Sequence, residues 1–378
     1  MMRSNPSFVL IENKAHLEHI VDALKKEDVM GVDIEADSMF HYQEKVCLIQ
    51  ISTPSQNILV DPLSFNDLSS LAPVFSDAHI RKIFHGADYD IRSLYRDFGI
   101  AVNNLFDTHI AARYLGIKET GLAPLLKGIL GITLDKKYQK RDWSLRPLSA
   151  GMLAYAVNDT SHLIALSEIL EEKLRDKNRL SWVSEECERL SDIRPVPPER
   201  NPFFIRFKNA RKLHPRDLAL LESILQLRDE TARRRDRPPF KILSNESILE
   251  IVEKKPAAKE DLGRIKGLSA GLLKKLGPSI LNRIKETHLL PEDQLPKFPK
   301  KAKTNNHIKA TKGIKSLKVW REQQAKVMGL DPALILTNAQ IESLTRVLPK
   351  NKKDLENMDN LRAWQIKRYG KEICNLLR

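Results

Sequence analysis

The sequence predicts an α/β domain, a mixed sheet with flanking helices, followed by two small all-α helical domains. Strand-like segments near the N-terminus give way to segments with helical spacing, which is typical of a mixed α/β layer fold. A proline-rich stretch follows near residue 195, and beyond it the sequence repeats itself at a spacing of 93 residues. A chain of 378 residues has room for more than one such domain.

Residues 29–60 are interpreted as three successive strands. The segments VMGVDIEA, VCLIQIST and NILVDP are each rich in branched aliphatic residues and are each ended by turn-forming residues. A further strand-like segment, RKIFHG, occupies residues 81–86, and from Tyr89 onward apolar residues recur mostly every three or four positions. Residues 152–178 are predicted to form one long amphipathic helix that closes this domain.

The C-terminal half contains an internal repeat. Without a gap, a shift of 93 positions aligns Asn245 with Asn338 and Pro256 with Pro349. In each copy a Ser-Asn or Thr-Asn pair marks the start of a helix, and the proline marks its end. Both copies are therefore predicted to be small all-α units.

The expected domain boundaries follow from these patterns. SDIRPVPPERNP has four prolines between residues 195 and 202, which is typical of a stiff linker. A second linker, rich in lysine and proline, separates the two copies. The predicted divisions are 1–190 for the α/β domain, 191–210 for the first linker, 211–290 for the first helical domain, 291–314 for the basic linker and 315–378 for the second helical domain.

Positive charge is concentrated in the C-terminal half. The chain has 63 Lys and Arg against 49 Asp and Glu, a net charge of +14, yet residues 1–190 contain 22 and 27 of them, a net of −5. The remainder therefore carries +19, which favours a polyanionic partner for the helical repeats. The densest basic runs are TARRRDRP at 231–238 and KFPKKAK at 297–303, for which a solvated surface or linker is the alternative interpretation.

Cysteine usage and hydropathy indicate a cytoplasmic protein. Cys47, Cys187 and Cys374 are far apart and have neither disulfide nor zinc-ligand spacing, so we expect them to be packing residues. The N-terminal segment lacks the apolar core of a signal peptide, and no run approaches the ~20 apolar residues of a membrane span. We therefore expect a soluble, intracellular chain that does not contact a membrane.

The segment GVDIEAD places two acids on one face of a predicted strand. Side chains alternate along a strand, so Asp33 and Glu35 share a face while Ile34 points to the other. Two carboxylates this close repel each other unless a cation lies between them, and hard oxygen ligands suit Mg²⁺ or Mn²⁺. A strand end that reaches solvent is the alternative interpretation.

Other acids in the first domain could complete such a site. Asp88 and Asp90 follow a strand-like segment at the start of a helix, where the helix dipole favours acids in any case. Tyr155 and Asp159 are four residues apart and so share a helix face. A tyrosine at this spacing is typical of a packed core, but beside a metal-binding acid it could orient a water molecule. A two-metal site needs about four carboxylates from separate elements.

The combined motifs resemble a known enzyme family. The order Asp-x-Glu on a first strand, an aspartate in HGADYDI and Tyr-x-x-x-Asp on a late helix resembles the DEDD superfamily of 3′-5′ exonucleases, in its tyrosine subtype. The strings VCLIQIST, FDTHIAARYLG and KKYQKRDWSLRPLS are similar to ribonuclease D and the related exonuclease of the nuclear exosome. The doubled C-terminal unit resembles the helical domain called HRDC. The resemblance covers residues 8–378 and implies a ribonuclease H-like mixed sheet in the first domain.

The resemblance also implies the site residues and the cofactors. Two divalent metal ions, Mg²⁺ or Mn²⁺, would be held by four carboxylates, and the tyrosine would help to position the attacking water. Asp90 matches the family pattern rather than Asp88, because the family's acid directly precedes a hydrophobic residue. The implied ligands are Asp33, Glu35, Asp90 and Asp159, and the implied tyrosine is Tyr155.

The expected function is that of a two-metal 3′-5′ exoribonuclease that releases nucleoside 5′-monophosphates. The resemblance implies RNA as the partner, through 3′ ends of tRNA precursors or other structured RNA, and it implies no obligatory protein partner. Lys137 and Arg141 could contact phosphates, and Tyr42 could stack on a terminal base.

Two other functions remain open from the sequence. A DNA-directed 3′-5′ exonuclease of the same superfamily would use the same carboxylates, although the chain has no phosphate-binding GxxxxGK[ST] motif of a helicase. A non-catalytic nucleic-acid-binding adaptor would use the helical repeats alone, but the intact set of acids argues against it.

Overall fold

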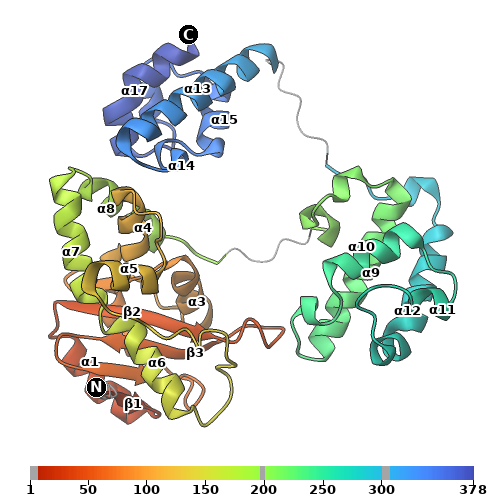
Figure 1. Cartoon of the computed structure of the whole chain (residues 1–378), viewed down its shortest axis with the longest axis horizontal. Coiled ribbons are helices and arrows are strands. Elements are labelled where there is room, and N and C mark those ends of the chain that lie inside the picture. Colours follow the sequence, from red (N-terminus) through yellow and green to blue (C-terminus); the bar gives the residue numbers. More distant parts are fainter. Residues whose placement is uncertain (1–6, 196–200, 300–306) are drawn as a thin grey trace. The chain divides into compact units, whose positions relative to one another are not determined.

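The computed structural model describes residues 7–195, 201–299 and 307–378 of the chain (Figure 1). The chain divides into two compact units. The first contains residues 1–36, 46–195 and 304–378, and the second contains residues 37–45 and 196–303. The N-terminal α/β domain and the last helical domain therefore belong to the same unit.

A six-stranded mixed sheet forms the centre of the α/β domain, in the order β1-β4-β3-β2-β5-β6. Strands β2, β3 and β4 pair antiparallel, whereas β1 pairs parallel to β4, and β5 and β6 continue parallel to β2. The predicted mixed sheet is confirmed. The strand bounds are β1 Val9–Ile11, β2 Val29–Ala36, β3 Val46–Ser52, β4 Asn57–Val60, β5 Arg81–Phe84 and β6 Leu105–Asp107.

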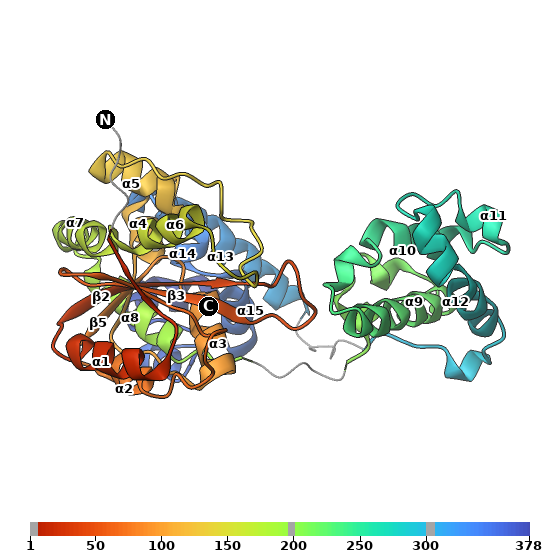
Figure 2. The ribbon, with the colours of Figure 1, turned by 90° about the horizontal axis from the view of Figure 1, so that it is seen from below.

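Helices cover both faces of this sheet, as Figure 2 shows with α6 and α7 on one side and α1 and α2 on the other. The helices on the two faces bury the branched aliphatic residues of the strands. Their bounds are α1 Lys14–Leu24, α2 Leu71–Ser76, α3 Asp88–Phe98, α4 Thr108–Leu115, α5 Leu122–Leu130, α6 Ala150–Thr160, α7 Leu163–Asp176 and α8 Leu180–Ser191.

The prediction of a single long helix over residues 152–178 is wrong, because α6 and α7 are separate helices with a break at Ser161 and His162. The end of α6 is fixed to the sheet by a hydrogen bond of 2.6 Å between the hydroxyls of Thr160 and Ser52. At Gly31 the sheet and helix approach so closely that an added Cβ would lie 2.9 Å from the Thr160 carbonyl oxygen. Tertiary contacts that a periodic pattern cannot reveal therefore end α6.

The last helical domain also belongs to the first unit. Its helices are α13 His307–Met328, α14 Pro332–Ile335, α15 Asn338–Val347, α16 Lys352–Glu356 and α17 Ala363–Leu377. The Glu185 carboxylate on α8 accepts the backbone N–H groups of Ala363 at 2.7 Å and Trp364 at 3.4 Å, and so caps α17. One residue further along α8, Glu186 pairs with Arg362 at 2.6 Å. The start of α17 is thus anchored on α8.

Aromatic packing reinforces this anchor. The indole rings of Trp182 on α8 and Trp364 on α17 stack with centroids 4.1 Å apart and an interplanar angle of 13°. Both side chains are buried. The guanidinium of Arg189 on α8 also donates to the carbonyl oxygens of Asp359 and Leu361. The hydrophobic core of the α/β domain therefore continues into the last helical domain.

The second unit contains the first helical domain, built from α9 Pro215–Arg234, α10 Asn245–Lys254, α11 Lys259–Leu262 and α12 Ala270–His288, with short 3₁₀ turns. Residues 37–45 pack with it. His41 pairs with Asp236 at 2.7 Å, and the Tyr42 hydroxyl donates to Asp229 at 2.8 Å.

The two repeats share their internal hydrogen bonds, as their alignment at 93 residues predicts. Arg228 donates to the carbonyl oxygen of Leu243 at 3.3 Å and to the Asn245 side chain at 2.7 Å. Arg321 makes the same two bonds at 2.9 and 3.0 Å to residues 336 and 338. Ser244 and Thr337 cap α10 and α15, and both helices end before the aligned prolines, which confirms the predicted helix limits.

The linkers are described only in part. Residues 196–200 and 300–306 lie outside the described part of the chain, and with them fall two of the linker prolines and most of the basic run 297–303. Helix α13 begins at His307, so its first turns fall in the segment expected to be a linker. The exact domain boundaries stay a prediction. Cys47, Cys187 and Cys374 are buried, and none of them forms a disulfide in the described part of the chain. Within the described ranges, no helix is long and apolar enough to cross a membrane.

We predict that Trp364→Ala destabilises the first unit by about 3 kcal/mol, because it removes one ring of a buried stack and leaves a cavity against α8. Urea unfolding followed by circular dichroism measures this effect. Val327→Ala on α13 is the matched control, since Val327 is 80% exposed and its truncation should change stability by less than about 0.5 kcal/mol. Equal unfolding midpoints for both variants would show that the stack adds no stability.

Candidate metal centre

Strand β2 supplies two carboxylates to one face of the sheet. Asp33 and Glu35 are both half-buried, while Ile34 between them is buried on the opposite face. Gly31, two residues before Asp33, lies under the α6–α7 break, so this is the face that α6 covers. The alternation predicted from the sequence is therefore confirmed, and the two acids face α6 rather than open solvent.

Helix α3 supplies Asp90, which is 7% exposed. Asp88, two residues earlier, is exposed. Its carboxylate forms an ion pair with the guanidinium of Arg92, one turn further along the same helix, at 2.8 Å. The two aspartates that the sequence offers as metal ligands on this helix therefore differ in burial. Asp90 is the buried acid of this helix, and Asp88 has a surface partner.

Asp107 fixes the chain at the start of α3. Its buried carboxylate accepts the backbone N–H groups of Gly86 at 3.0 Å and Ala87 at 2.8 Å, directly before the helix. It also accepts the N–H groups of His109 and Ile110 and so caps α4. Sequence reasoning missed this residue, although an aspartate before the helical segment THIAARYL is a typical N-cap signal.

Helix α6 supplies Asp159 and Tyr155, one turn apart. Asp159 is 8% exposed, and Tyr155 is half-buried and forms a hydrogen bond with it. The hydrogen bond of Thr160 to Ser52 holds this end of α6 on β3. The spacing of four residues therefore places the phenol and the carboxylate on the same face, toward the acids of β2.

These elements bring the predicted carboxylates together. Ligand oxygens of Asp33, Glu35 and Asp159 all lie within 4.8 Å of one another. Asp90 is close enough that its charge raises the pKa of both Asp33 and Glu35. Asp33, Glu35 and Asp159 thus converge on one point, and Asp90 lies outside this group of three but close enough to influence it.

The pKa values report the cost of this convergence. Burial, followed by the charges of Asp159 and Asp90, raises the pKa of Glu35 to about 9. Burial raises the pKa of Asp90 to about 8, with a further contribution from Asp107, and raises that of Asp159 to about 7. The pKa of Asp33 is raised well above its usual value by burial and by the neighbouring acids. Around neutral pH the cluster therefore holds protons that ordinary carboxyl groups would have lost.

A divalent cation fits this donor set. In the described residues, none of the four carboxylates forms an ion pair with lysine, arginine or histidine. The converging ligand atoms are all carboxylate oxygens, which are the ligands that Mg²⁺ and Mn²⁺ prefer. A cation would offset both the burial and the repulsion that raise the pKa values, and among the described residues no lysine, arginine or histidine pairs with these acids.

The predicted nucleic-acid contacts are not part of the cluster. Lys137 and Arg141 are exposed in the loop between α5 and α6, where the Lys137 ammonium lies 5.4 Å from the ring centroid of Tyr138. Tyr42 belongs to the second unit, and its ring lies 5.5 Å from the Arg233 guanidinium. Their roles toward nucleic acid stay predictions.

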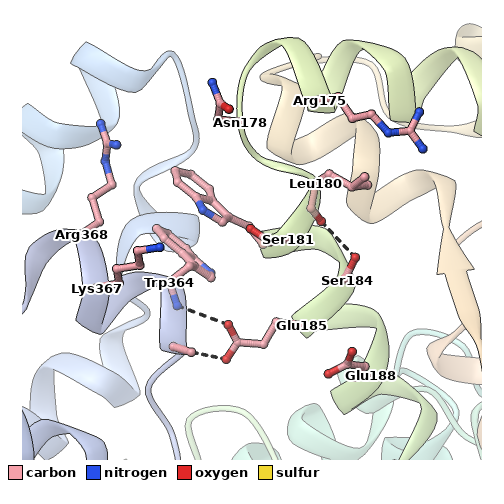
Figure 3. Close-up of a pocket in the computed structure, with 12 residues that line it drawn as sticks. Arg175, Asn178, Leu180, Ser181, Ser184, Glu185, Glu188, Trp364, Lys367 and Arg368 are labelled. Carbon is pink, nitrogen blue, oxygen red and sulfur yellow. Dashed lines mark hydrogen bonds between the residues drawn. The ribbon is translucent and has the colours of Figure 1, made fainter.

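A cavity of about 1140 Å³ lies between α8 and α17, and Figure 3 shows residues of both helices facing it. Its charges are mixed, with Lys367 and Arg368 across from Glu185 and Glu188. The Glu185 carboxylate is already engaged in capping α17. This cavity lacks the converging acids of the carboxylate cluster, so the cluster is the better candidate for a metal centre.

The comparisons with known proteins agree with this geometry. Residues 8–175 match the 3′-5′ exonuclease domain family, and residues 217–284 and 312–377 each match the HRDC domain family. Ribonuclease D of Gluconacetobacter diazotrophicus is 30% identical over 98% of this chain and 93% of its own. The crystal structure of Escherichia coli RNase D, described as an exoribonuclease involved in structured RNA processing, superposes with a TM-score of 0.72 at 25% identity over 98% of both chains.

A eukaryotic structure is similar as well. The catalytic core of RRP6 from Trypanosoma brucei, as a C496S mutant, aligns with a TM-score of 0.68 and 31% identity over 77% of this chain and 83% of its own. The fold and the site thus define a 3′-5′ exonuclease with two HRDC domains. The chain belongs to the ribonuclease D family.

We predict that Asp90→Asn stabilises the metal-free protein at pH 8. The folded pKa of Asp90, about 8, lies above its unfolded value of about 3.9. The contribution of Asp90 to stability is therefore complete below roughly pH 4 and is lost as pH rises through about 8. Asparagine does not ionise, so in EDTA the melting temperature of the variant should exceed that of the wild type by at least about 2 °C at pH 8 and match it near pH 4.

Asp88→Asn is the matched control for this measurement. Asp88 is exposed and paired on the surface, so its replacement should leave the pH dependence of the melting temperature unchanged. A wild-type stability in EDTA that does not fall between pH 4 and pH 8 would contradict the raised pKa of the cluster.

Proposed function

We propose that Asp33, Glu35, Asp90 and Asp159 bind two divalent cations, Mg²⁺ or Mn²⁺, at which the last phosphodiester of an RNA 3′ end is hydrolysed. The family already makes the chain a 3′-5′ exoribonuclease by class. The proposal rests on the convergence of these acids with no positive side chain described beside them. The product would be a nucleoside 5′-monophosphate at each step.

The bound cations would activate a water molecule and stabilise the negative charge that develops on the leaving 3′ oxygen. The chain contributes the geometry. Asp33 and Glu35 lie on β2, and Asp159 near the end of α6 lies within ligand distance of both. Asp90, at the start of α3, would be the fourth ligand, which is supported by the effect of its charge on the pKa of Asp33 and Glu35. Four acids from three elements can hold two cations without a protein nucleophile.

Tyr155 would position the attacking water. Burial, with the nearby Asp159 and Glu35, raises the pKa of Tyr155 above its usual value, so the phenol keeps its proton at physiological pH. A neutral phenol can donate one hydrogen bond and accept another. It can therefore orient a water molecule beside the carboxylates without acting as a base.

The substrate would be drawn in by both HRDC domains, since residues 315–378 contain 13 Lys and Arg against 7 Asp and Glu, a net of +6. Residues 211–290 contain 18 Lys and Arg against 11 Asp and Glu, a net of +7, whereas residues 1–190 are net negative. This charge would supply salt-dependent affinity for phosphates. We propose that tRNA precursors or other structured RNA are the substrates, supported by the structured RNA named for the Escherichia coli relative.

Three further residues would contact the RNA. The exposed Lys137 and Arg141 are free to approach phosphates near the 3′ end, and Tyr42 could stack on a base. We also propose that the protein works in the cytoplasm without an obligatory protein partner.

The test uses end-labelled single-stranded RNA and DNA of equal length, incubated with the purified chain in Mg²⁺, in Mn²⁺ and in EDTA. We expect stepwise shortening of the RNA from its 3′ end, and no shortening in EDTA. Asp33→Asn should lower the rate on the order of 1000-fold or more, because it removes one charge of the cation site. Asp88→Asn should retain near-wild-type activity, since its carboxylate is paired on the surface.

Two outcomes would overturn parts of this proposal. Faster shortening of DNA than of RNA would mean a DNA-directed exonuclease. Binding of RNA without any shortening, in wild type and Asp33→Asn alike, would mean a nucleic-acid-binding adaptor.

A further inference from the structure

Gln50 on strand β3 is a buried polar residue with no visible partner. Its side chain is 0% exposed. Over the described ranges of the chain, neither its amide nitrogen Nε2 nor its oxygen Oε1 has a hydrogen-bond partner. A buried amide without hydrogen bonds is costly, so its position in the fold calls for a physical explanation.

The register of the sheet places Gln50 directly beside the metal centre. Gln50 lies opposite Asp33 in the antiparallel pairing of β2 and β3, and opposite Leu59 in the pairing of β3 and β4. Directly opposed residues of antiparallel strands share a face, with their Cβ atoms about 4.5–5.5 Å apart. The Gln50 amide thus has the Asp33 carboxyl on one side and an apolar side chain on the other.

The other neighbours of Gln50 cannot satisfy it. Leu48, two residues earlier on the same face, is apolar and buried. Ser52, two residues later, already bonds through its hydroxyl to the side chains of Asn57 and Thr160. Helix α6 covers this face and contributes the apolar Ala156 and Val157 to the layer that contains Leu48 and Leu59. Asp33 is therefore the polar group that sheet register brings to the amide.

We propose that Gln50 is a positioning residue for the metal centre, whose Nε2 amide donates a hydrogen bond to the Asp33 carboxylate in the cation-bound site. An ionised carboxylate is a much stronger acceptor than a neutral acid. The bond would direct one oxygen of Asp33 toward the amide and leave the other for the cation. This inference rests on the proposed function, since it assigns Gln50 to the site that the four carboxylates form.

In the metal-free protein the Gln50 amide is therefore buried without a hydrogen bond, which lowers the stability of the fold. The amide gains its hydrogen bond only when the cation is bound, which strengthens cation binding. A residue of this kind has opposite effects on fold stability and on metal affinity, and a purely structural core residue does not.

The test replaces Gln50 with methionine, which has a similar shape but no amide. In EDTA the melting temperature of Gln50→Met should equal or exceed that of the wild type, because a buried unpaired amide is removed. Calorimetric titration with Mn²⁺ alone at pH 8 should show an affinity at least about tenfold weaker. With RNA as substrate, kcat should fall and KM should stay unchanged, because Gln50 is buried and does not reach the RNA.

Leu59→Met is the matched control, since Leu59 flanks Gln50 on the side away from Asp33 and lies in the same buried layer. It should change Mn²⁺ affinity by less than about twofold. Gln50→Leu serves as a second variant if the methionine variant is poorly folded, with the same results expected.

Unchanged Mn²⁺ affinity in both Gln50 variants would overturn the inference, and so would a melting temperature in EDTA that falls while the affinity is retained. A wild-type chain that binds no Mn²⁺ would instead overturn the proposed metal centre itself. The two failures are therefore distinguishable by the wild-type titration.

Discussion

The burial of several carboxylates close together, with the repulsion between them, is the constraint on which the site in the first unit depends. Asp33, Glu35, Asp90 and Asp159 are held close enough, in surroundings dry enough, for their pKa values to rise far above the ordinary range. In an unfolded chain these like-charged groups would move apart. Here a rigid strand and two helix ends keep them together, so the folded state bears a cost that cation binding can relieve.

Hydrogen bonds at the ends of helices hold the carboxylates in place despite this repulsion. Asp107 accepts four backbone N–H groups and thereby fixes the start of α3, while the hydroxyl pair of Thr160 and Ser52 fixes the end of α6. At Gly31 the absence of a Cβ allows α6 and the sheet to approach closely. None of these groups belongs to the predicted ligand set, yet each one determines where a ligand lies.

The two HRDC repeats keep the same internal bonds and differ on their surfaces. Arg228 and Arg321 make equivalent hydrogen bonds, so both copies close their helices in the same way. The second copy anchors to α8 through Trp364 and Arg362, and the aligned positions in the first copy are Gly271 and Ser269, which cannot form that anchor. The second copy is therefore built into the same unit as the α/β domain, whereas the first copy belongs to the other unit.

The sequence by itself determined the local structure and the list of candidate acids. Runs of branched aliphatic residues ended by turn residues predicted β2, β3 and β4, and the shared motif of the repeats predicted the limits of α10 and α15. Strands β1 and β6 have three residues each, too few to produce a pattern, and the break between α6 and α7 depends on contacts with β2 and β3. The family pattern had already selected Asp90 over Asp88, and the structure shows that Asp90 is buried whereas Asp88 is exposed. Only the tertiary structure decided that Asp107 holds the turn before α3 and that Gln50 lies beside Asp33. The physical reason is that periodicity records which face of an element is apolar, whereas the convergence of charges from distant segments depends on sheet register and on how helix ends dock.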